Sequence, residues 1–164
     1  MIVSIVWTVL LSLVFLYTQI LVMPAFTIAN VIPNILIPWL IYTVWTRPRN
    51  HALILIFFIG AMYDTLNPAT FGMYAFVFCL LGIIINEFRM PFEVDSTVAK
   101  MLTIGVANLI FILLQLLVFG LAYGFGTKLL TLSLIGFIYN LAFSFVVFWT
   151  MQLLSKVRLS IAHD

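Results

Sequence analysis

Six long apolar runs, separated by prolines, glycines and a few charged residues, take up nearly the whole chain. A hydrocarbon core about 30 Å thick is crossed by about 20 apolar helical residues. We therefore expect membrane-spanning helices at residues 2–22, 31–46, 51–66, 70–87, 98–123 and 129–155. Only 7% of the residues are charged and 65% are hydrophobic, whereas soluble domains have about 25% charged residues. Too few ionic groups remain to cover a water-facing surface, so most of the surface must face lipid.

These runs predict an all-α membrane protein, a six-transmembrane-helix bundle that forms one integral membrane domain over residues 1–164. The second span is short and contains Pro33 and Pro38. An interior proline removes a backbone hydrogen bond and kinks or breaks a helix. In lipid, unpaired backbone is tolerated only where protein or a water-filled cavity satisfies it. We expect residues 24–38 to pack inside the bundle or against a partner, with an ordinary Pro-kinked helix as the alternative.

The positions of the basic residues indicate the orientation, because short cytoplasmic loops are enriched in Lys and Arg. The loops after the second and fourth spans, together with the C-terminal tail, hold Arg47, Arg49, Arg89, Lys100, Lys156 and Arg158. The loops after the other spans hold only Lys128. We predict a multi-pass protein with both termini in the cytoplasm.

Small and polar residues recur at helical spacing in four of the spans, as expected for helix faces turned toward protein. These stripes are Ser4, Thr8, Ser12 and Gln19; Gly72, Ala75, Cys79, Gly82 and Asn86; Gly105, Asn108, Gln115, Gly120 and Gly124; and Ser133, Gly136, Asn140 and Ser144. Ordinary packing within one bundle explains each stripe, and a surface for a partner protein is the alternative.

Asp64 is the one acidic residue clearly inside a predicted span, near the outer end of that span. A charge within the bilayer is costly, so such residues usually face a bundle interior or a cavity. Gly60 lies one turn earlier on the same face and would let a neighbouring helix approach closely. Asp64 is expected either to organise the outer half of the bundle or carry an ion, or to accept hydrogen bonds from the turn at residues 67–70.

No pattern typical of catalysis or metal binding is found. His51 and His163 lie at the ends of spans without a second metal ligand at suitable spacing. No nucleophile motif, Walker loop or Rossmann glycine pattern occurs, and Asp64 has no second intramembrane carboxylate for an aspartyl mechanism. The single Cys79 excludes a disulfide framework, and the net charge of +2 is too small to imply a nucleic-acid partner. We expect neither an enzyme nor a bound cofactor.

Three motifs lie in the middle of the chain, roughly residues 30–87: Pro33-Asn34 at the start of the short second span, Gly60-Ala-Met-Tyr-Asp64 at the end of the third, and a proline-containing turn before Phe71-Gly72. In these motifs the chain shows a resemblance to the bacterial rod shape-determining MreD family. The resemblance implies a non-catalytic scaffold in the bacterial inner membrane that supports cell shape and lateral peptidoglycan synthesis. The implied partners are an MreC-type bitopic protein, a RodA-type glycosyltransferase, a penicillin-binding transpeptidase and MreB filaments, and a homodimer is left open.

From these patterns we select candidate structural and interaction residues. They are Ser4, Thr8, Ser12, Pro33, Asn34, Gly60, Asp64, Gly72, Gln115 and Asn140.

The MreD family is similar in fold to the substrate-binding S-components of energy-coupling-factor transporters. This similarity supplies the alternative function, a binding subunit for a vitamin or a metal. S-components contact their membrane partner through Ala-x-x-x-Ala in the first span, where this chain has Ser4, Thr8 and Ser12. The outer loops here are also short and nearly uncharged, which leaves little to close over a ligand, so the scaffold is favoured.

Overall fold

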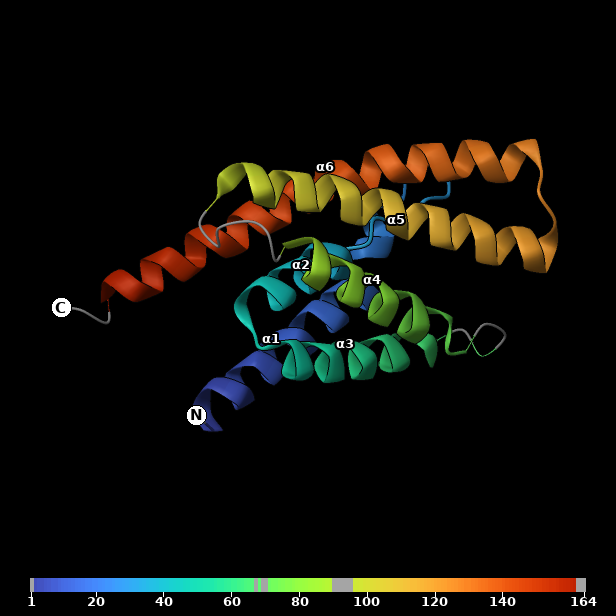
Figure 1. Ribbon diagram of the computed structural model, residues 1–164. Helices are drawn as coiled ribbons and strands as arrows, with labels where there is room; N and C mark the ends of the chain where they lie inside the picture. Colours follow the sequence, from blue (N-terminus) through green and yellow to red (C-terminus); the bar gives the residue numbers. More distant parts are fainter. Residues whose placement is uncertain (1, 67, 69–70, 90–95, 162–164) are drawn as a thin grey trace.

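The computed structural model describes residues 2–66, 68, 71–89 and 96–161, and the side chains of residues 6–66, 68, 71–88 and 96–153. Within these ranges the regular structure is helical, which confirms the predicted all-α class (Figure 1). The elements are α1 (Ile2–Leu21), the 3-10 helix η1 (Met23–Phe26), α2 (Leu36–Thr46), α3 (Arg49–Asp64), α4 (Met73–Arg89), α5 (Thr97–Tyr123) and α6 (Thr127–Ile161).

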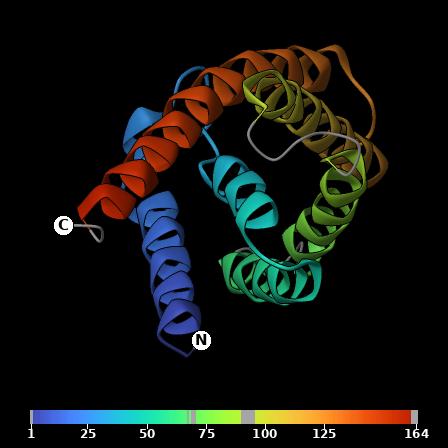
Figure 2. The ribbon, with the colours of Figure 1, turned by 60° about the vertical axis from the view of Figure 1, so that its left-hand side comes forward.

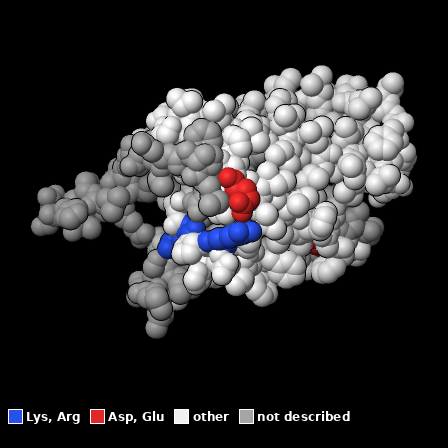
Figure 3. Space-filling view, viewed as in Figure 1, with Lys and Arg blue, Asp and Glu red and all other residues white. Residues whose placement is uncertain are grey.

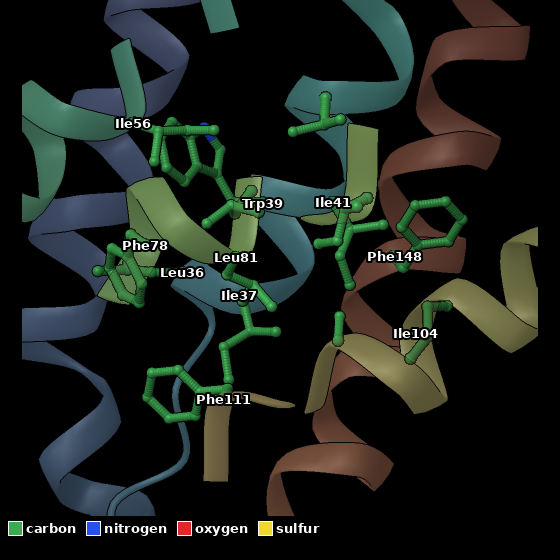
Figure 4. Packing of buried hydrophobic residues seen from close by; sticks show 14 of the residues in the cluster. Leu36, Ile37, Trp39, Ile41, Ile56, Phe78, Leu81, Ile104, Phe111 and Phe148 are labelled. Atoms are coloured by element: carbon green, nitrogen blue, oxygen red, sulfur yellow. The ribbon is translucent and has the colours of Figure 1, made fainter. Parts of the chain in front are cut away.

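Helix α2 is the centre of the bundle, and the other helices are arranged around it (Figure 2). Nine of its 11 residues are buried, since its sequence is apolar on every side. A helix that is apolar all round is stable only when other elements cover it completely. Figure 4 shows Leu36, Ile37, Trp39 and Ile41 of α2 among side chains of the surrounding helices, which include Ile56, Phe78, Leu81, Ile104, Phe111 and Phe148.

The predicted second span at residues 31–46 is helical only in its later part, because the helix begins at Leu36. Pro38 lies in the first turn of α2, where a proline is tolerated, so it does not kink the helix. With 11 residues α2 is about 16 Å long, roughly half the thickness of the hydrocarbon core. Residues 31–35 are not helical, and Pro33, Asn34 and Ile35 are buried.

Two helices are long and apolar enough to cross a membrane by their length and composition: α5, and residues Thr127–Leu153 of α6. Shorter apolar helices are found at Val6–Leu21, Leu36–Thr46 and Met73–Phe88. Each of the six predicted ranges overlaps a helix, although α3 and α4 are displaced by two or three residues and α6 continues six residues beyond the predicted end at residue 155.

The start of α1, the end of α6 and the connection from α2 to α3 lie at one end of the bundle (Figure 1). The connections from α3 to α4 and from α5 to α6 lie at the other end. At the first end Arg49 of α3 forms an ion pair with Glu87 of α4, at 3.2 Å, and Figure 3 shows acidic and basic side chains clustered there. Both partners are about half exposed, so this pair contributes little to stability. It does show that the predicted basic loops after the second and fourth spans share one end of the molecule.

Candidate functional site

Asp64, the last residue of α3, is fully buried, and its carboxylate binds the start of α4. The backbone N–H of Tyr74 donates to Oδ1 at 3.0 Å, and the N–H of Ala75 donates to Oδ2 at 2.9 Å. The first N–H groups of a helix have no acceptor within the helix. Gly72, which precedes α4, has no side chain that could cap them. Asp64 therefore caps α4 from a neighbouring helix, and its negative charge lies at the positive end of the α4 dipole.

Gly60 permits this contact, because α3 and α4 approach each other closely at this point. A Cβ atom at position 60 would lie 2.7 Å from Ala75 Cα and 3.0 Å from Ala75 N. Those atoms are backbone, so a side chain at this position requires the two helices to move apart. Further along the same interface, a Cβ at Gly82 of α4 would come within 3.2 Å of the Ile56 and Leu53 side chains of α3. The spacing Gly-x-x-x-Asp thus combines close approach and helix capping in one turn of α3.

The non-helical segment before α2 is held by side chains from α1 and α6. Gln19 of α1 donates through Nε2 to the Pro33 carbonyl at 3.2 Å, and its Oε1 accepts from Ile35 N at 2.8 Å. Gln19 therefore binds one acceptor and one donor of buried backbone that no helix satisfies. This supports the prediction of packing inside the bundle for the Pro33 to Pro38 part of the segment, whereas residues 25–30 are exposed.

Asn140 of α6 completes the contacts of this segment, since its Oδ1 accepts from Asn34 N at 2.8 Å. The Asn34 side chain in turn caps α2 by accepting from Leu36 N at 3.0 Å. An unsatisfied buried N–H costs about 1–3 kcal/mol. The three amide side chains Gln19, Asn34 and Asn140 together allow an unwound stretch of backbone to lie inside an apolar bundle.

Two further polar pairs join helices within the core. Trp39 of α2 donates through Nε1 to Ser12 Oγ of α1 at 3.2 Å, and the Ser12 hydroxyl donates to the Thr8 carbonyl at 2.7 Å. Ser144 of α6 donates to Asn108 Oδ1 of α5 at 3.2 Å. Ser12, Asn108 and Ser144 are all fully buried, so these members of the stripes belong to packing within the bundle.

Other predicted residues have different positions. A Cβ atom added at Gly72 would have no neighbour within 4 Å, and Gly72 adopts a φ of 92°, so it serves the turn before α4 rather than helix packing. The space over Gly120 is filled by the Phe125 ring of the same chain, so Gly120 and Gly124 do not form a docking groove for another helix. Gln115 is half-buried on α5, and Thr8 is half-buried on α1. The side chain of Ser4 lies outside the described residues.

The sequence does not reveal which groups these polar residues bind. It predicts for Asp64 either an organising role or a bond to the turn at residues 67–70, but the described partners of Asp64 are N–H groups of α4. The turn itself lies largely outside the described residues. The burial of Lys100 is also not predicted, since a lysine near the end of a span is expected to extend toward water, and Lys100 is instead only 9% exposed. Neither the partners of Asp64 nor the burial of Lys100 can be predicted from the sequence, because both depend on how the helices pack against one another.

Chemically, these groups bind the chain's own backbone and one another, and they join α1 to α2, α3 to α4, and α5 to α6. Among the described residues, no group of three or more His, Cys, Asp or Glu side chains is placed to hold a metal ion.

Comparison with known proteins gives one family. The family model described as rod shape-determining protein MreD matches residues 1–160. No curated protein and no solved structure matches the chain.

Proposed function

Because the chain belongs to the MreD family of rod shape-determining proteins, we propose that it acts as a non-catalytic membrane scaffold of the bacterial cell-elongation complex. In this role it supports lateral peptidoglycan synthesis by holding other proteins together rather than by chemistry of its own. The observation that carries the proposal is the match of the family over residues 1–160 of 164.

The proposed topology is six membrane spans in the bacterial inner membrane with both termini in the cytoplasm. The six-to-one distribution of basic residues supports it. So does the position of the start of α1 and the end of α6 at the bundle end that also holds Arg49 and Glu87 (Figure 1). On this topology α2 and the buried segment before it cross the membrane together, since α2 alone is too short.

The proposed partner is an MreC-type bitopic protein, joined in the larger complex by a RodA-type glycosyltransferase, a penicillin-binding transpeptidase and MreB filaments. Lipid gives helices no hydrophobic reason to associate, so partners must be selected by close packing and interhelical hydrogen bonds. The stripes on α4 and α6 are largely used inside the bundle. Gly105 of α5 has nothing within 4 Å of its Cβ position, and half-buried Gln115 has no hydrogen-bond partner among the described residues. We propose the face of α5 that contains Gly105 for the partner helix, with a second copy of the chain as the other candidate.

The buried contacts favour a scaffold over a transporter S-component. A binding subunit needs several polar groups that converge on its ligand, and the candidates in this chain are Gln19, Asp64, Asn67 and Gln115. Gln19 and Asp64 are already bound to backbone groups through both of their polar atoms. Asn67 lies outside the described residues.

The proposal is tested by depleting the protein from its own organism and restoring it from a plasmid. We expect depletion to give round cells and the wild-type chain to restore rods. The Gly105→Leu variant should be inserted and stable but should restore shape poorly, because the added side chain fills the space proposed for the partner. The matched control is Leu117→Val, at an exposed residue on another face of α5, and this variant should restore rods fully. Rod-shaped cells after depletion of the protein would contradict the proposed function. Full restoration of rods by Gly105→Leu would contradict the proposed partner surface on α5.

A further inference from the structure

The hairpin formed by the end of α5 and the start of α6 extends beyond the ends of α3 and α4 (Figure 1). Tyr74, in the first turn of α4, stacks on Phe111 of α5 with the ring centroids 6.5 Å apart. Helix α5 continues from Phe111 to Tyr123, which is about 18 Å at 1.5 Å per residue. We call the part of the hairpin at residues 112–135 the α5–α6 tip. This tip is therefore well beyond the level at which α4 begins.

The exposed segment that follows α1 contacts α6 at the base of the α5–α6 tip. The Tyr139 hydroxyl donates to the Phe26 carbonyl at 2.6 Å, and a Cβ atom added at Gly136 would lie 3.6 Å from the Val31 side chain. Thr127, the first residue of α6, lies about 13 Å further along the helix than Gly136 and about 18 Å further than Tyr139. The segment that follows α1 thus lies well short of the end of the tip.

This segment cannot lie in hydrocarbon. Residues 25–30 are exposed and residues 27–31 are not helical. Ala29 and Asn30 form a tight turn with φ values of 50° and 64°, and their N–H groups have no acceptor among the described residues. Irregular backbone that is exposed to lipid does not occur within the hydrocarbon region, because its polar groups would be unsatisfied. The boundary of the hydrocarbon must therefore come down to the level of this segment.

The α5–α6 tip has the opposite requirement. The one charged residue in its sequence is Lys128, at the far end next to Tyr123, and both residue types are frequent at the headgroup level of membranes. Between this end and the base, the side chains that are more than half exposed are apolar; they include Leu117, Leu121, Leu130 and Leu134. A surface of this kind is stable in lipid and not in water. The boundary of the hydrocarbon around the tip must therefore lie near Tyr123 and Lys128.

The two requirements set the boundary of the hydrocarbon at two different depths around one molecule. We propose that the protein locally thins the lipid leaflet at this end of the bundle, around η1 and the end of α3, while the leaflet keeps its full thickness around the α5–α6 tip. The helix lengths agree with this arrangement, since α3 is about 24 Å long and α5 about 40 Å. A bilayer adapts to a span shorter than its hydrocarbon core by thinning. This effect on the membrane goes beyond the scaffold function and requires only that α5 and α6 cross the membrane, in either orientation.

The test compares the depths of two positions at the same height on α6. In a Cys79→Ser background, Ala25→Cys reports the segment that follows α1, and Ile138→Cys reports the exposed face of α6. They are the sequence neighbours of the bonded residues Phe26 and Tyr139. Each full-length variant carries a nitroxide and is reconstituted in dioleoylphosphatidylcholine vesicles, where power saturation in electron paramagnetic resonance measures the depth of the label. We expect the residue 25 label at the headgroups and the residue 138 label about 10 Å or more inside the hydrocarbon.

Two results would overturn the proposal. If both labels were in water, the α5–α6 tip would emerge from a flat membrane. If both were in hydrocarbon, the segment that follows α1 would be immersed in lipid.

A strong tilt of the whole bundle is the remaining way to bring the segment that follows α1 and the end of the tip to one depth in a flat bilayer. Polarised infrared spectroscopy of the wild type in oriented bilayers of the same lipid measures the mean helix tilt. We expect a mean tilt of about 20°, as is usual for membrane helices. A mean tilt above about 40° would overturn the proposal even if the two labels differed in depth as expected.

Discussion

Asp64 is a carboxylate inside an apolar bundle, and its two oxygens are both used to cap another helix. The sequence is sufficient to predict that this residue faces protein, because a charge in a span must be compensated. It is not sufficient to identify the partner. The N–H groups of Tyr74 and Ala75 come within reach of the carboxylate only once α3 and α4 lie side by side, and nothing in the local sequence specifies that register. Gln19 and Asn140 also stand out in the sequence, because a polar side chain within a span needs a hydrogen-bond partner. Their backbone partners near Pro33 cannot be predicted from the sequence either.

The capping role leads to a graded prediction for Asp64. In Asp64→Asn one side-chain oxygen remains, so one of the two N–H groups of α4 keeps its acceptor. In Asp64→Leu both N–H groups lose theirs, at a cost of about 1–3 kcal/mol each. We expect the melting temperature in detergent to fall modestly for Asn and by about 5 °C or more for Leu. Equal losses in the two variants would show that the negative charge, and not the number of acceptors, is what matters.

Helix α2 and the segment before it show where sequence analysis fails at the scale of an element. Hydropathy locates the apolar run and the two prolines, but a helix and a buried extended segment are equally apolar. The extended form is stable only because Gln19 and Asn140 are available from helices far away in the sequence. The boundaries of α1 and α5 agree with the prediction to within one residue. At the end of α5 the boundary is marked by a local feature, Gly124, which has a φ of 88°.

The contact between α3 and α4 can be tested with two glycines. In Gly60→Ala the new Cβ would lie 2.7 Å from the backbone of Ala75, so the helices must separate and the cap at Asp64 must lengthen. We expect a loss of about 1–3 kcal/mol, read as a lower melting temperature in detergent.

The matched control is Gly105→Ala on α5, where nothing lies within 4 Å of the Cβ position. This change should be neutral or slightly stabilising, because alanine is the better helix former. If both variants melted at the same temperature, the close approach at Gly60 would not be important for stability.

At the scale of the whole molecule, the composition is enough to predict a helical membrane protein, and the resemblance over residues 30–87 is enough to predict the family. The arrangement of the other helices around α2 is not predictable in this way. It depends on which polar residue meets which, as with Ser12 and Trp39 or Asn108 and Ser144. Stripes at helical spacing show that these residues face protein, but not which helix they contact.

The proposed topology predicts the accessibility of single cysteines in a Cys79→Ser background. Asn50→Cys, at the bundle end with the basic loops, should be shielded from a membrane-impermeant thiol reagent in intact cells. Thr127→Cys, at the opposite end, should be labelled. Asn50 and Thr127 are both exposed in the structure, so a difference between them reports the membrane and not burial in the protein. Labelling of Asn50→Cys in unbroken cells would reverse the orientation.

The most direct test of the scaffold account is native mass spectrometry of the tagged protein, extracted from its own membrane in mild detergent. One spectrum reports both the protein partners and any small molecule that remains bound. We expect a complex that contains an MreC-type bitopic protein, with lipid as the only small-molecule component. A vitamin or metal bound at about one per chain, together with a transmembrane transporter subunit and its ATPases, would contradict the scaffold account and establish the S-component alternative.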